Sequence, residues 1–261
     1  MRPGGLLVVT AHPDDESLIA GGLLAACAAA GIPTGVACLT RGELGDVADP
    51  ALVGPGRTLG DVRLDELRAA CTTLGVDLLR CFRRRDGELP WAPRAELAAQ
   101  LARLMRQTRP AAVVTFGDDG LYYHHDHLAV SAFTRRAVQT LRDERGAPAL
   151  YESVWPTQTS VALVAQLRHR GLPTGLWDLP PEDFGTDDTD GSFAVDVSDF
   201  AAIKLRALQC HRTQLAQDHA FTALPADLAR TYLGVEHFRA DQPGAHAADW
   251  LLHAASSAAD A

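Results

Sequence analysis

The segment from Leu6 to Thr40 limits the fold of this chain more than any other part of the sequence. Leu6–Thr10 and Thr34–Thr40 are short runs of apolar and β-branched residues, and residues 15–30 between them have a helical pattern. These patterns predict a buried strand, a helix and a second buried strand. Because two buried strands joined through one helix form a parallel βαβ unit, we expect an α/β fold.

The same segment contains 22 residues without a formal charge, 18–39, which is long enough to be tested as a transmembrane helix. Gly31 and Pro33 interrupt it, however, and the pattern changes from Ala/Leu-rich to β-branched beyond them. A helix breaker together with a change of period favours a helix, a turn and a strand over a membrane span. We therefore expect no membrane insertion.

The alternation of helix and strand continues and then weakens. Residues 43–60 and 177–191 are rich in Gly, Pro and Asp and are expected to be loops, and Gly75 is expected to cap a helix. The expected strands are 78–82, 111–116, 151–154 and 194–197, and the expected helices are 61–74, 94–107, 126–142, 200–211 and one beginning near 247. The predicted fold is Rossmann-like, with a mostly parallel sheet flanked by helices in three layers and additional C-terminal strands and helices.

No internal repeat or low-complexity linker divides the chain, so 1–261 is expected to be one domain. Within it, a catalytic N-terminal part of about 1–145 would precede a substrate-shaping C-terminal part of about 146–261. The net charge of -9 argues against nucleic acid or an anionic membrane as a partner. The five cysteines form no CxxC pair, and an odd number is a poor disulfide framework. The N-terminal apolar run is too brief for a signal peptide. Both observations favour the reducing cytoplasm as the location. The oligomeric state stays open, a homo-oligomer included.

Two polar turns follow predicted strands. His12 and Asp15 stand three residues apart where the first strand gives way to a helix, and the sequence HHDH at 124–127 follows the strand 111–116. Alone, the first turn could be a helix cap and the second a solvated helix start. Ligands of an open parallel sheet bind beyond the carboxyl ends of its strands, so the two turns together favour a zinc site with three protein ligands and a water.

These motifs resemble the PIG-L/LmbE-like zinc-dependent N-deacetylases, which remove acetyl groups from N-acetylglucosamine-type sugars. The resemblance covers nearly the whole chain in the family's order. It rests on AHPDDE at 11–16, TRGELGD at 40–46, RLDELRAACTTLG at 63–75, TFGDDGLYYHHDH at 115–127 and KLRALQCHRTQ at 204–214. It implies that His12, Asp15 and His127 bind zinc and that Asp14 is the general base.

The resemblance also implies roles for neighbouring catalytic residues. His124 would stabilise the tetrahedral intermediate or protonate the leaving amine, since the ordinary pKa of an imidazole is near neutral. Tyr122 would lie near the developing oxyanion, with one of Tyr122 and Tyr123 facing the site and the other the core. Asp126 would hold a histidine in one tautomer.

Substrate-binding positions of some relatives match Arg63 and Asp86, and a loop near the site matches Arg41 and Glu43. A surface salt bridge is an equal alternative for Arg63. Glu16 could cap a helix or support a zinc-bound histidine, and the role of His211 stays open. His125 stands where many relatives have proline, so it could compete for the metal or face solvent.

We therefore expect a zinc hydrolase that removes the N-acetyl group from an N-acetylglucosamine-type conjugate, as in bacillithiol-type or mycothiol-type biosynthesis. The alternatives are a zinc hydrolase of another small N-acyl amine and a non-catalytic module that binds a sugar or a metal. Asp14 argues against the module, because a binding protein needs no base beside its metal. The sequence does not name the group attached to the sugar.

Overall fold

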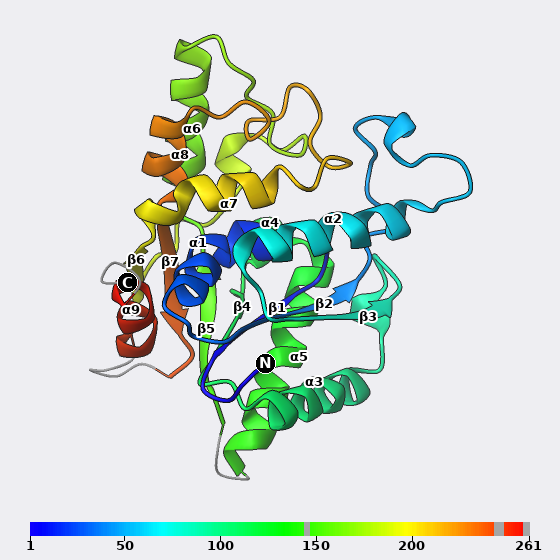
Figure 1. Cartoon of the computed structure of the whole chain (residues 1–261), viewed down its shortest axis with the longest axis vertical. Helices are drawn as coiled ribbons and strands as arrows, with labels where there is room; N and C mark the ends of the chain where they lie inside the picture. The colour runs from blue at the N-terminus through cyan, green and yellow to red at the C-terminus, as the bar shows by residue number, and fades with distance from the viewer. Residues whose placement is uncertain (144–146, 243–247, 258–261) are drawn as a thin grey trace.

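A seven-stranded sheet forms the centre of the computed structural model, which describes residues 1–143, 147–242 and 248–257 (Figure 1). The strands of the described residues lie in the order β3-β2-β1-β4-β5-β7-β6. They are β1 (Leu6–Thr10), β2 (Thr34–Thr40), β3 (Leu78–Arg84), β4 (Ala112–Phe116), β5 (Ala149–Val154), β6 (Ser192–Asp196) and β7 (Val235–Ala240).

The five strands from β3 to β5 are parallel, whereas β7 and β6 extend the sheet in antiparallel pairing. β1 and β2 are buried along their whole length, as expected for apolar runs covered on both faces. β1 lies between β2 and β4, so the chain leaves β1 and β4 at the point where the strand order reverses. Open α/β sheets bind their ligands at this switch point.

Helices cover both faces of the sheet. α1 (Asp15–Ala29), α2 (Leu59–Leu74) and α7 (Ala201–Leu208) pack together on one face, and α3 (Arg94–Thr108) packs with α5 (His125–Asp143) on the other (Figure 1). The remaining helices are α4 (Gly120–Tyr123), α6 (Thr157–His169), α8 (Ala226–Leu233) and α9 (Asp249–Ser256), and short 3₁₀ turns occur at Pro50–Leu52, Leu89–Trp91, Pro181–Asp183 and Ser198–Phe200. This arrangement confirms the predicted three-layer, mostly parallel α/β fold.

The structure confirms the predicted helix, turn and strand of 15–40, and no helix of the described residues is long and apolar enough to cross a membrane. Gly75 ends α2 in the left-handed conformation, with φ 74°. Helices α4, α6 and α8 and strand β7 were not predicted from the sequence. The expected division near residue 145 and the expected helix start at 247 lie outside the described residues. All five cysteines are free.

Helix α1 is interrupted at Ala20, whose φ of -151° and ψ of 21° are not helical. The backbone N–H groups of Gly22 and Leu23 donate to the carboxylate of Glu236 in β7, at 2.7 and 3.0 Å. The Lys204 ammonium of α7 donates to the same carboxylate at 2.8 Å, and both side chains are buried. A residue near the end of the chain therefore completes the hydrogen bonding of the helix that follows β1.

Candidate metal centre and active site

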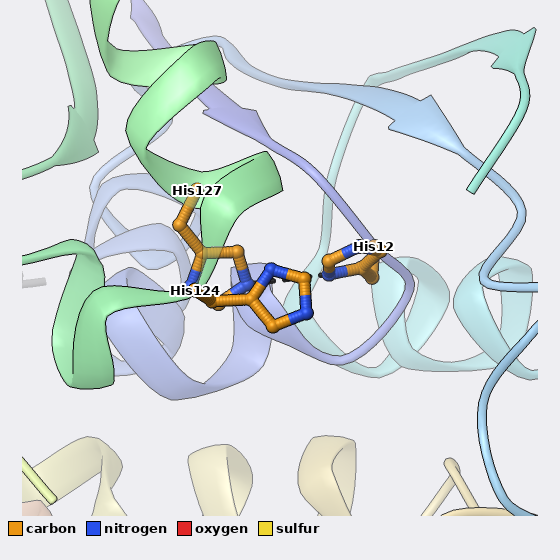
Figure 2. Close-up of side chains that lie close together, drawn as sticks. All are labelled: His12, His124 and His127. Atoms are coloured by element: carbon orange, nitrogen blue, oxygen red, sulfur yellow. Dashed lines mark hydrogen bonds between the residues drawn. The ribbon is translucent and has the colours of Figure 1, made fainter. Parts of the chain in front are cut away.

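The turns after β1 and β4 bring His12, Asp15 and His127 together at the switch point. The His12 Nδ1 and His127 Nε2 atoms are 3.2 Å apart, Asp15 Oδ2 is 3.6 Å from His12 Nδ1, and Asp15 Oδ1 is 3.3 Å from His127 Nε2. All three side chains are buried. Figure 2 shows His12 reaching from the turn after β1 toward His124, which precedes α5, and His127, which lies in the first turn of α5. Two turns that are 115 residues apart in the sequence thus meet at one point.

The outer nitrogen of each of these two histidines is already hydrogen-bonded. His127 Nδ1–H donates to the Gly120 carbonyl at 3.0 Å, and His12 Nε2–H donates to Asp86 Oδ1 at 3.0 Å and to Asp126 Oδ2 at 3.3 Å. In these tautomers, the nitrogens that face each other carry lone pairs, and a carboxylate faces both. Three electron-pair donors so close together repel one another unless a cation lies between them.

The dimensions of this triangle fit a small divalent ion. Ligand bonds of about 2.0–2.1 Å in a tetrahedral zinc site place neighbouring donor atoms about 3.3 Å apart. Without a cation, His12 takes up a proton: burial lowers its pKa, but Asp126, Asp86 and Asp15 outweigh burial and raise it to about 10. Burial likewise opposes ionisation of Asp15, yet His127 and His12 hold the pKa of that carboxyl well below its usual value.

Two further groups of side chains lie close enough to be considered as metal ligands. One comprises His12, His124 and His127, and the other comprises His12, Asp86 and Asp126. In the second group, Asp126 already accepts from the backbone N–H groups of Gly87 and Leu89, at 2.8 and 3.1 Å. Asp126 and Asp86 are therefore better suited to orienting His12 than to binding an ion themselves.

Asp14 lies beside the triangle in a strained backbone conformation. Its φ is 112°, which is rare for a residue with a side chain, and it makes no capping hydrogen bond to α1. Arg63 Nη2 donates to Asp14 Oδ2 at 3.1 Å and to the Pro13 carbonyl at 2.7 Å. Burial raises the pKa of Asp14 to about 6, although Arg63 counteracts it. Arg63 itself is only 4% exposed, so the alternative of a surface salt bridge is wrong.

Glu16 and His211 hold the strained turn from the other side. The Asp14 backbone N–H donates to Glu16 Oε2 at 3.0 Å, and His211 Nε2–H donates to Glu16 Oε1 at 2.9 Å. Both side chains are almost completely buried, at 0% and 1% exposure. Burial lowers the pKa of His211, but the Glu16 carboxylate outweighs burial and raises it. Glu16 therefore accepts from the backbone N–H of Asp14, the N-cap residue of α1, and from a distant histidine that is not one of the proposed metal ligands.

His124 and Tyr122 border the same space. The Asp126 N–H donates to His124 Nδ1 at 3.2 Å, so the proton of the neutral ring is on Nε2. Burial and the neighbouring His127 and His12 lower the pKa of His124 to about 4, below the ordinary value of an imidazole. Burial and the neighbouring Asp15 raise the pKa of Tyr122, so its hydroxyl keeps its proton.

The remaining predicted site residues are divided between the cavity and its surroundings. Asp86 lines the cavity, whereas Arg41 and Glu43 do not. Arg41 pairs with Asp61 at 2.8 Å, and Glu43 accepts from the backbone N–H of Asp86 at 3.2 Å. His125 is exposed to solvent at the start of α5.

The expectation that one of two adjacent tyrosines faces the core is wrong. Tyr122 lines the cavity, but Tyr123 is 70% exposed. The backbone between these residues is irregular, with φ -151° at Tyr122 and 58° at Tyr123, so no simple alternation of faces applies.

The cavity in front of these residues has a volume of about 610 Å³. This is a usual size for a small-molecule site. Its wall includes Trp177, Asp178, Asp218 and His219, which come from two C-terminal loops and which sequence reasoning did not single out. Only the Gly/Pro/Asp-rich composition of 177–191 hinted at a loop there, and nothing in the sequence paired it with residues 213–219.

Comparison with known proteins gives matches along most of the chain. A model of the family described as "PIG-L: GlcNAc-PI de-N-acetylase" matches residues 7–138. The 1D-myo-inositol 2-acetamido-2-deoxy-alpha-D-glucopyranoside deacetylase of Acidothermus cellulolyticus is 34% identical over 256 residues, which cover 89% of this chain and 87% of that protein. The corresponding deacetylase 2 of Catenulispora acidiphila is 33% identical over 288 residues, which cover 95% and 94%.

Solved structures share the fold. The N,N'-diacetylchitobiose deacetylase from Pyrococcus horikoshii superposes with a TM-score of 0.63 at 23% identity, over 93% of this chain and 85% of that one. At this identity the superposition supports the α/β fold alone.

Proposed function

The chain belongs to the PIG-L family, and on that premise we propose that it is a zinc-dependent hydrolase that removes the N-acetyl group from an N-acetylglucosamine conjugate. The observation that supports this most is the buried triangle of His12, Asp15 and His127, with Asp14 beside it. Relatives at 33–34% identity, named for deacetylation of an inositol-linked acetamido sugar, support the same reaction.

Zinc fits this donor set because two imidazole nitrogens and one carboxylate oxygen are its ordinary ligands, at a spacing of about 3.3 Å. His12 Nδ1, His127 Nε2 and an Asp15 oxygen would hold the ion. When bound there, zinc would polarise the acetamide carbonyl and lower the pKa of a water molecule to about 7. Asp86 and Asp126 would keep the His12 ring in the required tautomer through Nε2–H.

Asp14 would be the base that takes the proton from the attacking water. Arg63 occupies Asp14 Oδ2, which leaves Oδ1 for that proton. The water oxygen bonds to the acetamide carbon, the carbon–nitrogen bond breaks, and Asp14 passes the proton to the departing amine. The products are acetate and a free amino sugar. A carboxyl whose pKa burial raises toward neutrality is suited to both transfers.

His124 and Tyr122 would act on the carbonyl oxygen as negative charge develops on it. The neutral His124 ring has its proton on Nε2, and Tyr122 retains its hydroxyl proton. Both can therefore donate hydrogen bonds in a buried site, where such bonds stabilise an oxyanion most strongly. This favours oxyanion stabilisation over amine protonation as the role of His124.

The substrate would contact both parts of the chain. We propose that residues 1–145 supply the metal ligands, the base and the sugar contacts of Arg63 and Asp86, while residues 146–261 shape the outer cavity. Arg41 and Glu43 would act indirectly, through Asp61 and through the Asp86 backbone. The substrate class is a small acetylated amino-sugar conjugate of mycothiol type, and the free cysteines are consistent with a cytoplasmic enzyme.

The test is a panel of N-acetylglucosaminides, with inositol and malate among the attached groups, incubated with zinc-loaded protein. Amine and acetate should appear in equal amounts. Asp14→Ala should keep its zinc and fold but lose nearly all turnover. Binding without release of amine from any conjugate would instead indicate a non-catalytic module, and release from other N-acyl amines alone would indicate a different hydrolase.

A further inference from the structure

The cavity continues beyond the metal centre to a wall built by two C-terminal loops. Gly175 and His219 form an isolated parallel bridge, in which the Gly175 N–H donates to the Asp218 carbonyl and the Ala220 N–H donates to the Gly175 carbonyl, both at 2.8 Å. These bonds fix the loops to each other. The wall is therefore formed before any ligand binds, which lowers the entropic cost of binding.

Aromatic rings connect this wall with the metal centre. The Tyr122 ring stacks on Phe184 at 5.7 Å, Phe184 stacks on Trp177 at 5.8 Å, and Trp177 meets His219 edge-on at 4.4 Å between ring centroids. Tyr122, Trp177 and His219 line the cavity, whereas Phe184 is buried behind them. A conjugate whose acetamide lies at His12 and Tyr122 thus has its attached group directed along these rings toward Trp177 and His219.

His219 presents a hydrogen-bond donor that has no acceptor. Its Nδ1 accepts the backbone N–H of Phe221 at 3.2 Å, so the proton of the neutral ring is on Nε2. Burial lowers the pKa of His219 to about 4, which keeps the ring neutral. Nε2 is buried and has no hydrogen-bond partner among the described residues. Since an unpaired buried donor is costly, a ligand oxygen at this wall would stabilise it.

Acidic side chains outnumber basic ones in the cavity lining. Six aspartates line it, namely Asp14, Asp15, Asp46, Asp86, Asp178 and Asp218. Arg63 is the single arginine or lysine in the described lining, and it is already paired with Asp14. Three of the aspartates, Asp46, Asp178 and Asp218, are exposed around the outer part of the cavity. A carboxylate or phosphate on the substrate would meet like charges there and no free cation.

We propose that Trp177 and His219 form the subsite for the group attached to the sugar, and that Asp178 and Asp218 exclude anionic groups from it. The inference rests on the proposed deacetylase function and adds its specificity determinants. Trp177 packs against the apolar face of a ring, and His219 Nε2–H donates to one of its hydroxyl oxygens. The subsite accepts neutral polyhydroxylated rings and rejects groups that carry a carboxylate.

Exclusion of anionic groups is tested with two conjugates of N-acetylglucosamine, one linked to inositol and one to malate. The zinc-loaded protein should favour the inositol conjugate in kcat/KM by about tenfold or more. The double variant Asp178→Asn and Asp218→Asn should reduce this preference by about tenfold through faster turnover of the malate conjugate. The control Asp187→Asn and Asp190→Asn removes the same charge from an exposed loop outside the cavity lining, and it should leave the preference unchanged.

The donor role of His219 is tested by comparing the inositol conjugate with a cyclohexyl conjugate that lacks the hydroxyl groups. His219→Phe keeps a ring beside Trp177 but removes the donor. It should lower kcat/KM for the inositol conjugate by about fivefold to tenfold and leave that for the cyclohexyl conjugate unchanged. An equal loss with both conjugates would show that His219 is only a structural residue and would overturn this part of the proposal.

N-Acetylglucosamine without an attached group separates the two proposals. If the wild-type protein deacetylates no glucosaminide, the proposed function itself fails. If it deacetylates the unsubstituted sugar and both conjugates equally well, the reaction stands but the proposed subsite is refuted.

Discussion

Replacement of Glu16 by Gln tests whether the strained Asp14 backbone matters for turnover. A residue at φ 112° costs about 1–3 kcal/mol of strain, and the Glu16 carboxylate opposes that cost by accepting the Asp14 N–H at 3.0 Å. Glutamine keeps the size of the side chain, but it has one acceptor oxygen where the carboxylate has two, and a bond from the Asp14 N–H to that oxygen is no longer charge-assisted. The difference is about 1 to 1.5 kcal/mol. If the catalytic position of Asp14 becomes less favourable by this free energy, kcat falls about fivefold to tenfold.

The measurement is kcat and KM for amine release, together with zinc content by elemental analysis. Zinc content and KM should stay unchanged, because Glu16 does not contact His12 or His127 in the described contacts. The matched control is Glu66→Gln on α2, since Glu66 accepts the N–H of Thr213 at 2.8 Å, close to His211 in the chain, without touching Asp14. The control should retain wild-type kcat.

A double-mutant cycle adds a second criterion. Glu16 and His211 act on Asp14 through one shared contact, so Glu16→Gln combined with His211→Gln should cost little more than the worse single variant. Additive losses, an unchanged kcat in Glu16→Gln, or a parallel loss of zinc would each refute the positioning argument.

Three further predictions concern other parts of the site and its supports. His127→Ala should lose zinc affinity, whereas the exposed neighbour His125→Ala should retain full zinc content. Arg63→Met should shift the acidic limb of the pH profile of kcat/KM to higher pH, because Arg63 lowers the pKa of Asp14 and the base must be ionised; Arg63→Lys should shift it less. Glu236→Ala should lower the free energy of unfolding by about 3–5 kcal/mol in chemical denaturation, because it leaves Lys204 buried and unpaired; an unchanged midpoint would contradict the role of this pair.

The sequence was sufficient to predict the parallel part of the sheet because its strands are short apolar runs separated by helical patterns. Strand β7 was not predicted because Glu236 and His237 interrupt its apolar pattern. Glu236 is buried there because its carboxylate accepts backbone N–H groups of α1. Helix α6 follows Pro156 in a stretch rich in Thr, Gln and Ser, where the apolar periodicity is weak.

The two ligand turns could be predicted because each is continuous in the sequence and follows a recognisable strand. The outer cavity could not, since Trp177 and His219 meet across a contact between two loops. The shifted pKa values of the site residues could not be predicted from the sequence either, because they depend on burial and on neighbours in the folded chain. His124 lies among other imidazoles, and only the folded arrangement lowers its pKa.

The interruption of α1 at Ala20 has a consequence for protein synthesis. The N–H groups of Gly22 and Leu23 donate to the carboxylate of Glu236, which is synthesised more than two hundred residues later. While a ribosome is still making the chain, the helix that begins with Asp15 lacks this acceptor. We therefore expect a nascent chain released before β7 to bind metal poorly, so that incomplete products stay inactive.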